Sequence, residues 1–398
     1  MKRLFIEPLD VLMFRSERPF VARESHVAKS GAISPLTFDG AIKSKLFLEF
    51  CKRKGYSPQD FQRRKSGSET EEEFKRSSEK LREEVKNKLS IDYELKELLE
   101  IIGYSPLGLS SKLNILGAFL SEEDKGECFL FPNDIVMADE EERTLLKLNP
   151  VIKDKLKIPE VEAYVCLSGY SKAENVSAYL SFNALKDYLQ GLIPNKTLIV
   201  EKPYVIEERI GIKLEREKKK AAEAYLYKAE FLRLKDKWGF IIWYESPIEV
   251  PNGVIKLGGE GRGAICKKLN DVNLMETLEF AKLIDEVNEE KKFKLYLATP
   301  SCFNGWKPPS EKLKETLGVK NLRLIAALPG KPIYIGGYDF ALNKEKPLQR
   351  WVNAGAVYYY TFEGTIDVNL VLPIRILEDN IDMRCAFIGR WGKCLKKP

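Results

Sequence analysis

The chain has 398 residues, and its 65 Lys and Arg against 59 Asp and Glu give a formal net charge of +6. With 44% hydrophobic and 31% charged residues, its composition is that of a globular protein of roughly two or three domains. A single histidine, His26, and seven scattered cysteines without a C-x-x-C pair exclude histidine-rich metal sites, a disulfide framework and paired-histidine ribonuclease chemistry.

The mild positive charge is compatible with an RNA partner if basic residues gather in a groove or if other subunits share the binding. Residues 1–14 hold charges and a proline within their apolar stretch, so they do not form a signal peptide. No run of about eighteen apolar residues occurs anywhere in the chain. We therefore expect a cytoplasmic protein with no membrane partner.

The first predicted element is a mostly buried strand over residues 3–14, and an irregular basic stretch follows it. Ser34 and Pro35 predict the start of a helix, because serine caps helix N-termini and proline is favoured in the first turn. A strand, a polar loop and a helix in this order form the first half of a split β-α-β unit.

The composition changes between Lys52 and Glu100, where about half of the residues are charged and large apolar residues are few before Leu95. One interpretation is a solvated helical insertion or partly disordered loop that contributes little to a core. The other is a docking surface for a partner. Under the first interpretation, deletion of residues 60–90 leaves the thermal midpoint almost unchanged.

The rest of the chain predicts more strands than helices, without regular alternation of the two. The segments that we expect to be strands are 163–168, 197–200, 224–234, 239–244, 254–257, 293–298, 332–336, 356–362 and 367–372. Residues 271–292 have the apolar spacing of an amphipathic helix. This pattern favours an α+β fold over a doubly wound parallel sheet.

Four glycines in the six positions 258–263 form the most informative motif of the chain. They allow positive φ angles and a close approach of backbone amides to a ligand. The motif also fits the dinucleotide fingerprint G-x-G-x-x-A, but a predicted strand follows it rather than a phosphate-binding helix. Two interpretations remain, a tight glycine hairpin and a loop that approaches an RNA backbone with Arg262 as the phosphate partner.

Two further residues have both a functional and a structural interpretation. His26 could line an RNA site or act as a general base, but there is no second histidine to serve as the acid. Trp306, in a turn-rich loop beside Lys307, could stack on a base or anchor its loop on the core.

Several stretches together resemble the RAMP superfamily of CRISPR proteins. They are residues 6–20, 34–37, 208–212, 226–234, 258–262, 336–339 and 353–360. Their order and spacing resemble the third-numbered subunit of the Cmr complex, the type III-B effector. The resemblance covers residues 4 to about 360.

The resemblance implies an α+β fold of two ferredoxin-like (RRM-like) domains. The first would span residues 1–275, with the charged insertion at about 52–105 and the glycine-rich loop at 258–263, and the second would span 276–398. It also implies a non-catalytic subunit without cofactor or metal. Such a subunit holds the 5′ tag of the guide crRNA and bridges the large polymerase-like Cmr subunit to the neighbouring backbone RAMP subunit. The small Cmr subunit is a further candidate partner.

The RNA-binding residues that we predict lie in the glycine run, in the matched stretches and in the basic segment after the first strand. They are Gly258, Gly259, Gly261, Arg262, Gly263, Arg209, Lys43, Arg18, His26, Lys29 and Trp306. The main alternative is a metal-independent crRNA-processing endoribonuclease of the same superfamily, in which His26 acts with a tyrosine or lysine. A nucleotide-binding enzyme that uses the glycine run is a weaker one.

Overall fold

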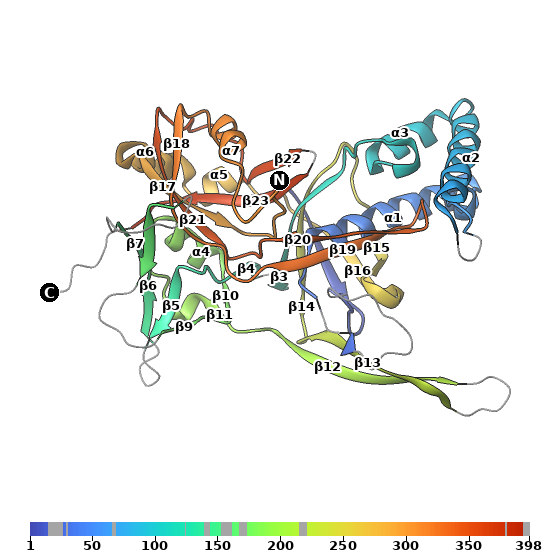
Figure 1. Ribbon diagram of the computed structural model, residues 1–398, viewed down its shortest axis with the longest axis horizontal. Coiled ribbons are helices and arrows are strands. Elements are labelled where there is room, and N and C mark those ends of the chain that lie inside the picture. The colour runs from blue at the N-terminus through green and yellow to red at the C-terminus, as the bar shows by residue number, and fades with distance from the viewer. Residues whose placement is uncertain are drawn as a thin grey trace.

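The computed structural model describes residues 1–14, 27–28, 31–65, 69–123, 125–138, 144–152, 161–166, 173–214, 221–378 and 380–392. Two large sheets dominate these residues (Figure 1). The eight-stranded sheet has the order β11-β10-β4-β3-β14-β1-β16-β15, and the five-stranded sheet has the order β18-β21-β17-β23-β22. Their strand pairs are antiparallel, which agrees with the predicted α+β class and not with a doubly wound parallel sheet.

The strands of the eight-stranded sheet are β1 (Lys2–Pro8), β3 (Asn114–Glu122), β4 (Gly126–Leu130), β10 (Tyr179–Leu180), β11 (Ile199–Val200), β14 (Trp238–Glu245), β15 (Gly253–Leu257) and β16 (Arg262–Leu269). Those of the five-stranded sheet are β17 (Lys292–Leu297), β18 (Asn321–Leu328), β21 (Val357–Glu363), β22 (Ile374–Glu378) and β23 (Ile381–Gly389).

Two of the smaller sheets have three strands. One joins β2 (Val27–Ala28) with β12 (Tyr204–Leu214) and β13 (Ala221–Leu234), and the other joins β5 (Ile135–Ala138) with β6 (Thr144–Lys147) and β9 (Ala173–Asn175). Two more have two strands, β19 (Ile333–Asp339) with β20 (Lys344–Trp351) and β7 (Asn149–Ile152) with β8 (Ala163–Cys166). The helices are α1 (Pro35–Lys54), α2 (Glu71–Leu89), α3 (Tyr93–Ile102), α4 (Phe182–Leu189), α5 (Leu274–Thr277), α6 (Phe280–Glu290) and α7 (Ser310–Leu317). Short 3-10 turns lie at η1 (Pro58–Phe61), η2 (Ser105–Leu107), η3 (Lys196–Leu198) and η4 (Gly259–Gly261). No described helix is long and apolar enough to cross a membrane.

The two large sheets repeat one topology. In the first, β1 and β3 flank β14 and α1 lies in the connection between them, which confirms the predicted split β-α-β unit. In the second, β17 and β18 flank β21 in the same way, with α7 in the connection. Each sheet ends in a pair of strands, β15 with β16 and β22 with β23.

Each half also carries a hairpin that leaves its large sheet. The hairpin β12–β13 comes between β3 and β14, and the hairpin β19–β20 comes between β18 and β21. Figure 1 shows β12–β13 as a long arm at the lower edge of the molecule and β19–β20 as a ribbon across its front. The two hairpins therefore occupy corresponding positions in the repeated topology.

The start of α1 follows the sequence prediction. Ser34 caps the helix with its side chain, which accepts a hydrogen bond from the backbone N–H of Leu36 at 3.3 Å. The helix ends at Gly55 in the left-handed conformation, with φ of 74°. Phe38 and Ile42 of α1 are fully buried in the core of the first sheet.

The charged stretch 52–100 is helical, but the prediction that it adds little to the core is wrong. Leu81 and Val85 of α2 are 4% and 0% exposed, and they join the core that contains Leu95 and Leu99 of α3. Leu81 and Val85 are four positions apart, so they lie on one face of the helix. This narrow apolar face is sufficient because α3 and the turns η1 and η2 supply the other side of the contact.

Several predicted element boundaries are also wrong. The strand expected over 3–14 ends at Pro8, although the chain stays buried from Val11 to Phe14. The helix expected over 271–292 is broken at Glu279, whose φ of 49° separates α5 from α6. Residues 367–372 form turns rather than a strand. The predicted strand 163–168 is described only as Ala163–Cys166, and the one at 197–200 is only Ile199–Val200.

Candidate nucleic-acid interface

The segment 9–14 after β1 passes between the glycine-rich turn and the hairpin β12–β13. The backbone N–H of Leu9 donates to the carbonyl of Gly263 at 3.0 Å on one side. On the other side, Leu12 and Leu232 of β13 exchange two backbone hydrogen bonds of 2.9 and 2.8 Å. A small buried cluster fills the contact with the hairpin, and its members are Val11, Met13, Ala229 and Phe231.

The glycine-rich turn is a hairpin, because Leu257 of β15 pairs directly with Arg262 of β16. Gly258 has a φ of 73°, and a Cβ on it would lie 2.6 Å from the carbonyl oxygen of Met13. The backbone N–H of Gly259 donates to the same oxygen at 2.7 Å. Gly258 is therefore needed for a close approach of the chain to itself, whereas a Cβ on Gly259 would come no nearer than 3.4 Å to Met13. The Gly259 N–H is therefore engaged within the chain, and the contact of the glycine run with RNA stays a prediction.

The turn places Arg262 beside two arginines of the hairpin. Arg209 lies on β12 and Arg233 on β13, and all three guanidinium groups face the carboxylate of Asp10. The nitrogen–oxygen distances are 3.9 Å for Arg209, 3.3 Å for Arg233 and 3.7 Å for Arg262. We call Asp10 and these three residues the arginine cluster.

Two further carboxylates pair with the arginine cluster. Glu207 accepts hydrogen bonds from Arg233 at 2.6 Å and Arg209 at 2.7 Å, and these bonds lower the pKa of its carboxyl group. Glu260 pairs with Arg262 at 3.1 Å. The pKa of Asp10 is also lowered, first by the hydrogen bond from the backbone of Val11 and then by the arginines. Asp10 and Glu207 are therefore ionised at neutral pH.

These ion pairs are accessible to solvent. The side chains of Arg209, Arg233 and Arg262 are 37%, 44% and 26% exposed. Exposed ion pairs contribute little to stability because water and salt screen them. A phosphate group can therefore replace a carboxylate at these guanidinium groups at little cost, and arginine binds phosphate in a bidentate manner.

The ring of Phe231 fixes the positions of two of the guanidinium groups. The guanidinium carbons of Arg209 and Arg262 lie 5.1 and 5.0 Å from its centroid. Phe231 is only 3% exposed, so its ring is held by the packing of the hairpin against segment 9–14. The arginines are therefore held in place before any ligand arrives.

The structure brings together Arg209 and Arg262, two of the residues predicted from the sequence, but the sequence analysis missed Arg233 and Asp10. A signal for Arg233 was available. Glu207 and Arg209 are two positions apart on β12, and Phe231 and Arg233 are two positions apart on β13, with Glu207 opposite Phe231. Alternation along paired strands places these side chains on one face.

The other predicted residues lie elsewhere. Lys43 of α1 pairs with Asp39 at 2.7 Å. Trp306 is partly buried against the core of the second sheet, and its carbonyl accepts a hydrogen bond from Tyr358 at 2.5 Å, which agrees with the interpretation as a loop anchor. Trp306 and Arg350 line a cavity of about 30 Å³. Three predicted residues lie outside the described part of the chain, and they are Arg18, His26 and Lys29.

The described residues contain no group of three or more His, Cys, Asp or Glu side chains that could hold a metal ion. Cys51 and Cys266 are buried, and burial raises the pKa of each thiol to about 11. A reactive cysteine has a lowered pKa, so neither thiol has the properties of a nucleophile.

Comparison with known proteins identifies the family of the chain. A family model described as CRISPR-associated protein (Cas_Cmr3) matches residues 4–368. The chain belongs to this family. The match confirms the resemblance to a RAMP-type subunit of the type III-B Cmr complex that the sequence motifs indicated. A search of curated proteins finds no match.

Solved structures with similar chains come from CRISPR effector complexes. One is a cryo-EM structure of the type III-B Cmr-beta bound to cognate target RNA and AMPPnP, with 17% identity, 90% of this chain and 86% of that chain covered, and a TM-score of 0.43. A second, of Cmr-beta bound to cognate target RNA, has 16% identity, the same coverage and a TM-score of 0.44. The crystal structure of a Csm3-Csm4 subcomplex of the type III-A interference complex has 12% identity, coverage of 99% and 100%, and a TM-score of 0.36.

Proposed function

We propose that this Cas_Cmr3 family member is a non-catalytic RNA-binding subunit of a type III-B effector and that its arginine cluster holds the 5′ tag of the guide crRNA. The observation that carries the proposal is the convergence of Arg209, Arg233 and Arg262 around Asp10. The hairpin β12–β13 and strand β16 supply the arginines, the segment after β1 supplies Asp10, and all three guanidinium groups are partly exposed. Arginines held in this way position an RNA backbone through its phosphates.

The cluster binds RNA by exchange of partners. Asp10, Glu207 and Glu260 balance the charge of the arginines in the free protein, and phosphates of the tag take over part of these contacts. The glycine-rich turn contributes by holding Arg262 beside the hairpin rather than by offering the Gly259 amide, which is bonded to Met13. A short single strand bound in this way needs only a mild net charge on the subunit.

We also propose two ferredoxin-like domains, residues 1–275 and 276–398, with the glycine-rich loop in the first. The matching strand orders β3-β14-β1-β16 and β18-β21-β17-β23 support this division. In the complex, the chain bridges the large polymerase-like subunit to the neighbouring backbone RAMP subunit, with the small subunit as a further neighbour. The helical insertion 52–105 projects from the first domain toward one side in Figure 1 and is available for such a contact.

Binding of guide RNA to variants of the full chain tests the site. Arg262→Ala removes one guanidinium group, and Gly261→Asp adds a negative charge to the turn. The Cβ of the new residue at Gly261 would meet nothing closer than 4.0 Å, and aspartate tolerates its φ of 60° better than most residues. We expect both variants to bind tagged guide RNA more weakly than the wild type and to melt like it.

The matched control is Arg53→Ala, because Arg53 is 65% exposed on α1 and does not belong to the cluster. Unchanged affinity in both cluster variants would remove the turn from the RNA site. The same incubation, carried out in EDTA, tests the non-catalytic assignment. Cleavage of the guide RNA by the purified chain would support the endoribonuclease alternative instead.

A further inference from the structure

The second hairpin, β19–β20, forms an exposed two-stranded ribbon that is held at both ends. We call it the ribbon, residues 333–351. All residues of β20 except its last, Trp351, are exposed. In Figure 1 the ribbon crosses the front of the molecule from the second sheet to the helices of the insertion.

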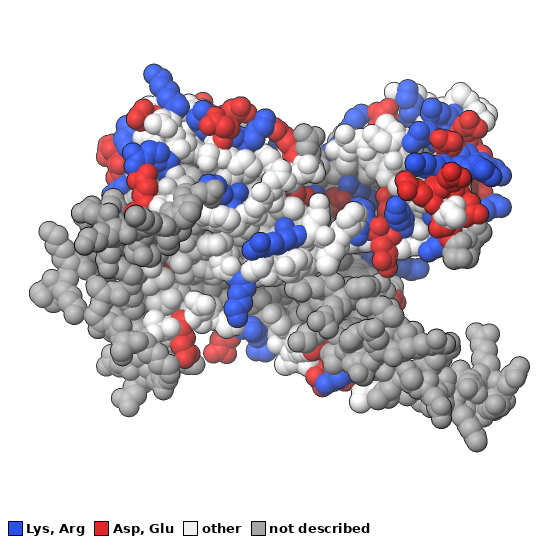
Figure 2. Space-filling view, viewed as in Figure 1, with Lys and Arg blue, Asp and Glu red and all other residues white. Residues whose placement is uncertain are grey.

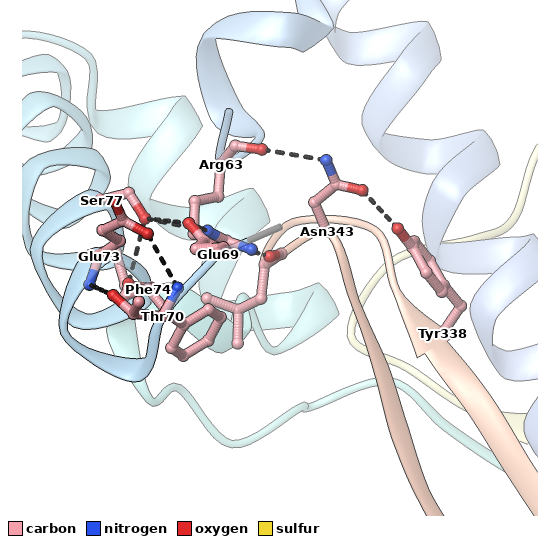
Figure 3. A network of polar contacts seen from close by, with 10 residues as sticks. Arg63, Glu69, Thr70, Glu73, Phe74, Ser77, Tyr338 and Asn343 are labelled. Carbon is pink, nitrogen blue, oxygen red and sulfur yellow. Dashed lines mark hydrogen bonds and ion pairs between the residues drawn. The ribbon is translucent and has the colours of Figure 1, made fainter. Parts of the chain in front are cut away.

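The tip of the ribbon is fixed to the helical insertion through Arg63, which is 2% exposed (Figure 3). Its backbone N–H donates to the carbonyl of Ala341 and its Nε to the carbonyl of Leu342, both at 2.7 Å. Asn343 donates from its side chain to the carbonyl of Arg63 at 3.3 Å. The guanidinium group also pairs with Glu69 of the insertion. These contacts hold the tip against the first domain.

The base of the ribbon is fixed to the second core. Trp351 is 2% exposed, and the next residue, Val352, exchanges two backbone hydrogen bonds of 2.8 and 2.9 Å with Ser301. A ribbon anchored at both ends keeps its shape, so its exposed side chains have fixed positions. Fixed positions reduce the entropic cost of binding a ligand there.

One face of the ribbon presents two tyrosines to solvent. Tyr334 and Tyr338 are 40% and 41% exposed, whereas Ile333 and Ile335, which flank Tyr334 along β19, are half-buried. The tyrosines are four positions apart, which places them about 13 Å apart along the strand. Arg350 lies directly opposite Tyr334. The spacing leaves room for each ring to accept its own base.

Three cations on and beside the ribbon differ from those of the arginine cluster in their lack of acidic partners. Among the described residues, Lys331, Lys346 and the Arg350 side chain have no ion pair or hydrogen-bond partner. The acidic side chains of the ribbon are Asp339, which accepts a hydrogen bond from the backbone of Leu342 at 2.9 Å, and the exposed Glu345. In the middle of the face that the ribbon crosses, Figure 2 shows Lys and Arg side chains that are surrounded by uncharged surface.

We propose that the outward face of the ribbon is a second site for single-stranded RNA, separate from the arginine cluster. Bases stack on Tyr334 and Tyr338, and Arg350, directly opposite Tyr334, contacts the phosphates. Aromatic rings flanked by unpaired cations are the features that bind single strands without sequence preference. The topology supports the assignment, because the ribbon takes the same place in the second half as the arginine-bearing hairpin β12–β13 takes in the first.

The test uses the full chain, a fluorescent oligouridine without the tag sequence, and photocrosslinking of its 4-thiouridine derivative. Tyr334→Ala should weaken binding roughly 5- to 150-fold, the range expected for the loss of one stacked base. The matched Tyr334→Phe keeps the ring and should bind as the wild type does. Arg350→Ala should reduce the slope of log affinity against log salt by about 0.7. Crosslinks should map to the peptide that contains residues 333–351.

Two results would overturn the proposal. The first is unchanged affinity of Tyr334→Ala together with crosslinks only outside the ribbon. The second is normal RNA binding by the same variant with loss of another subunit from the purified complex, which would make the ribbon a protein-docking face. Arg262→Ala serves as a parallel arm, because its effect on tagged guide RNA reports on the arginine cluster and not on the ribbon.

Discussion

Leu81→Ala on α2 offers a quantitative test of how the helical insertion packs into the core beside the eight-stranded sheet. Leu81 of α2 is 4% exposed and lies in the core that also contains Val85 and Leu99. Burial of a methylene group is worth about 0.8 kcal/mol, so the three carbon atoms removed by this change cost about 2.4 kcal/mol. The cavity left between α2 and α3 raises the expected loss to about 3 kcal/mol.

Urea unfolding followed by circular dichroism measures this loss, provided that the slope of the transition is unchanged between wild type and variant. The control is Lys80→Ala, the neighbouring position on α2, whose side chain is 78% exposed. It should change the stability by less than about 0.5 kcal/mol. A loss of less than about 1 kcal/mol for Leu81→Ala would refute the inference that the insertion is part of the core.

The burial of α2 also changes the result expected for the deletion of residues 60–90, for which the solvated interpretation of the sequence gives an almost unchanged thermal midpoint. The deletion removes Leu81 and Val85, and it also removes Phe61, whose carbonyl accepts a buried hydrogen bond of 2.6 Å from Tyr104. We expect the chain around the eight-stranded sheet to unfold or to aggregate at room temperature. A thermal midpoint within a few degrees of the wild type would restore the view of a solvated insertion.

Three further predictions follow from buried polar groups. Arg63→Met should speed hydrogen exchange of residues 333–351, because the tip of the ribbon loses the hydrogen bond from Arg63 Nε to Leu342 and keeps only its contacts with the Arg63 backbone. Equal exchange would mean that this side chain does not hold the ribbon in place. Burial raises the pKa of Tyr244 to about 12, so the folded state keeps a proton that the unfolded state releases above about pH 10. Stability should therefore fall from pH 10 to 12 less steeply in Tyr244→Phe, as urea midpoints would show, and identical slopes would contradict the burial. Lys294 lies 3.9 Å from Asp134, and both side chains are fully buried. Lys294→Met alone should lower the free energy of unfolding in urea by about 3–5 kcal/mol, and the double variant with Asp134→Asn should lower it by clearly less. Equal losses in the single and double variants would show that the pair is not coupled.

The sequence predicted elements whose signals are local. The cap at Ser34 and the apolar runs of β13 and β14 needed no knowledge of the rest of the chain. The apolar pair Leu81 and Val85 could not be recognised as core, because a narrow face among charged residues is meaningful only once α3 packs against it.

In the candidate site, too, the sequence predicted what depends on local signals and missed what depends on long-range contacts. Arg262 was found because a glycine-rich turn is visible in the sequence, but its neighbours depend on pairings over a long range. Asp10 meets Arg209 and Arg233 only because segment 9–14 is inserted between two hairpins about two hundred positions further along the chain. The function of the glycines also depended on the fold, since the group that approaches Gly258 is the carbonyl of Met13 and not a ligand.

The salt dependence of guide RNA binding tests the central claim most directly. The double variant Arg209→Ala with Arg262→Ala removes two guanidinium groups from the cluster, and the matched pair Arg53→Ala with Arg323→Ala removes two arginines that are 65% and 59% exposed elsewhere. The account predicts that the slope of log affinity against log salt for the tagged RNA falls by about 1.4 in the cluster variant, because each phosphate of a single strand that an arginine neutralises adds about 0.7 to the slope. The matched pair should keep the slope of the wild type. Equal slopes in the cluster variant and the wild type would show that these arginines do not touch the RNA.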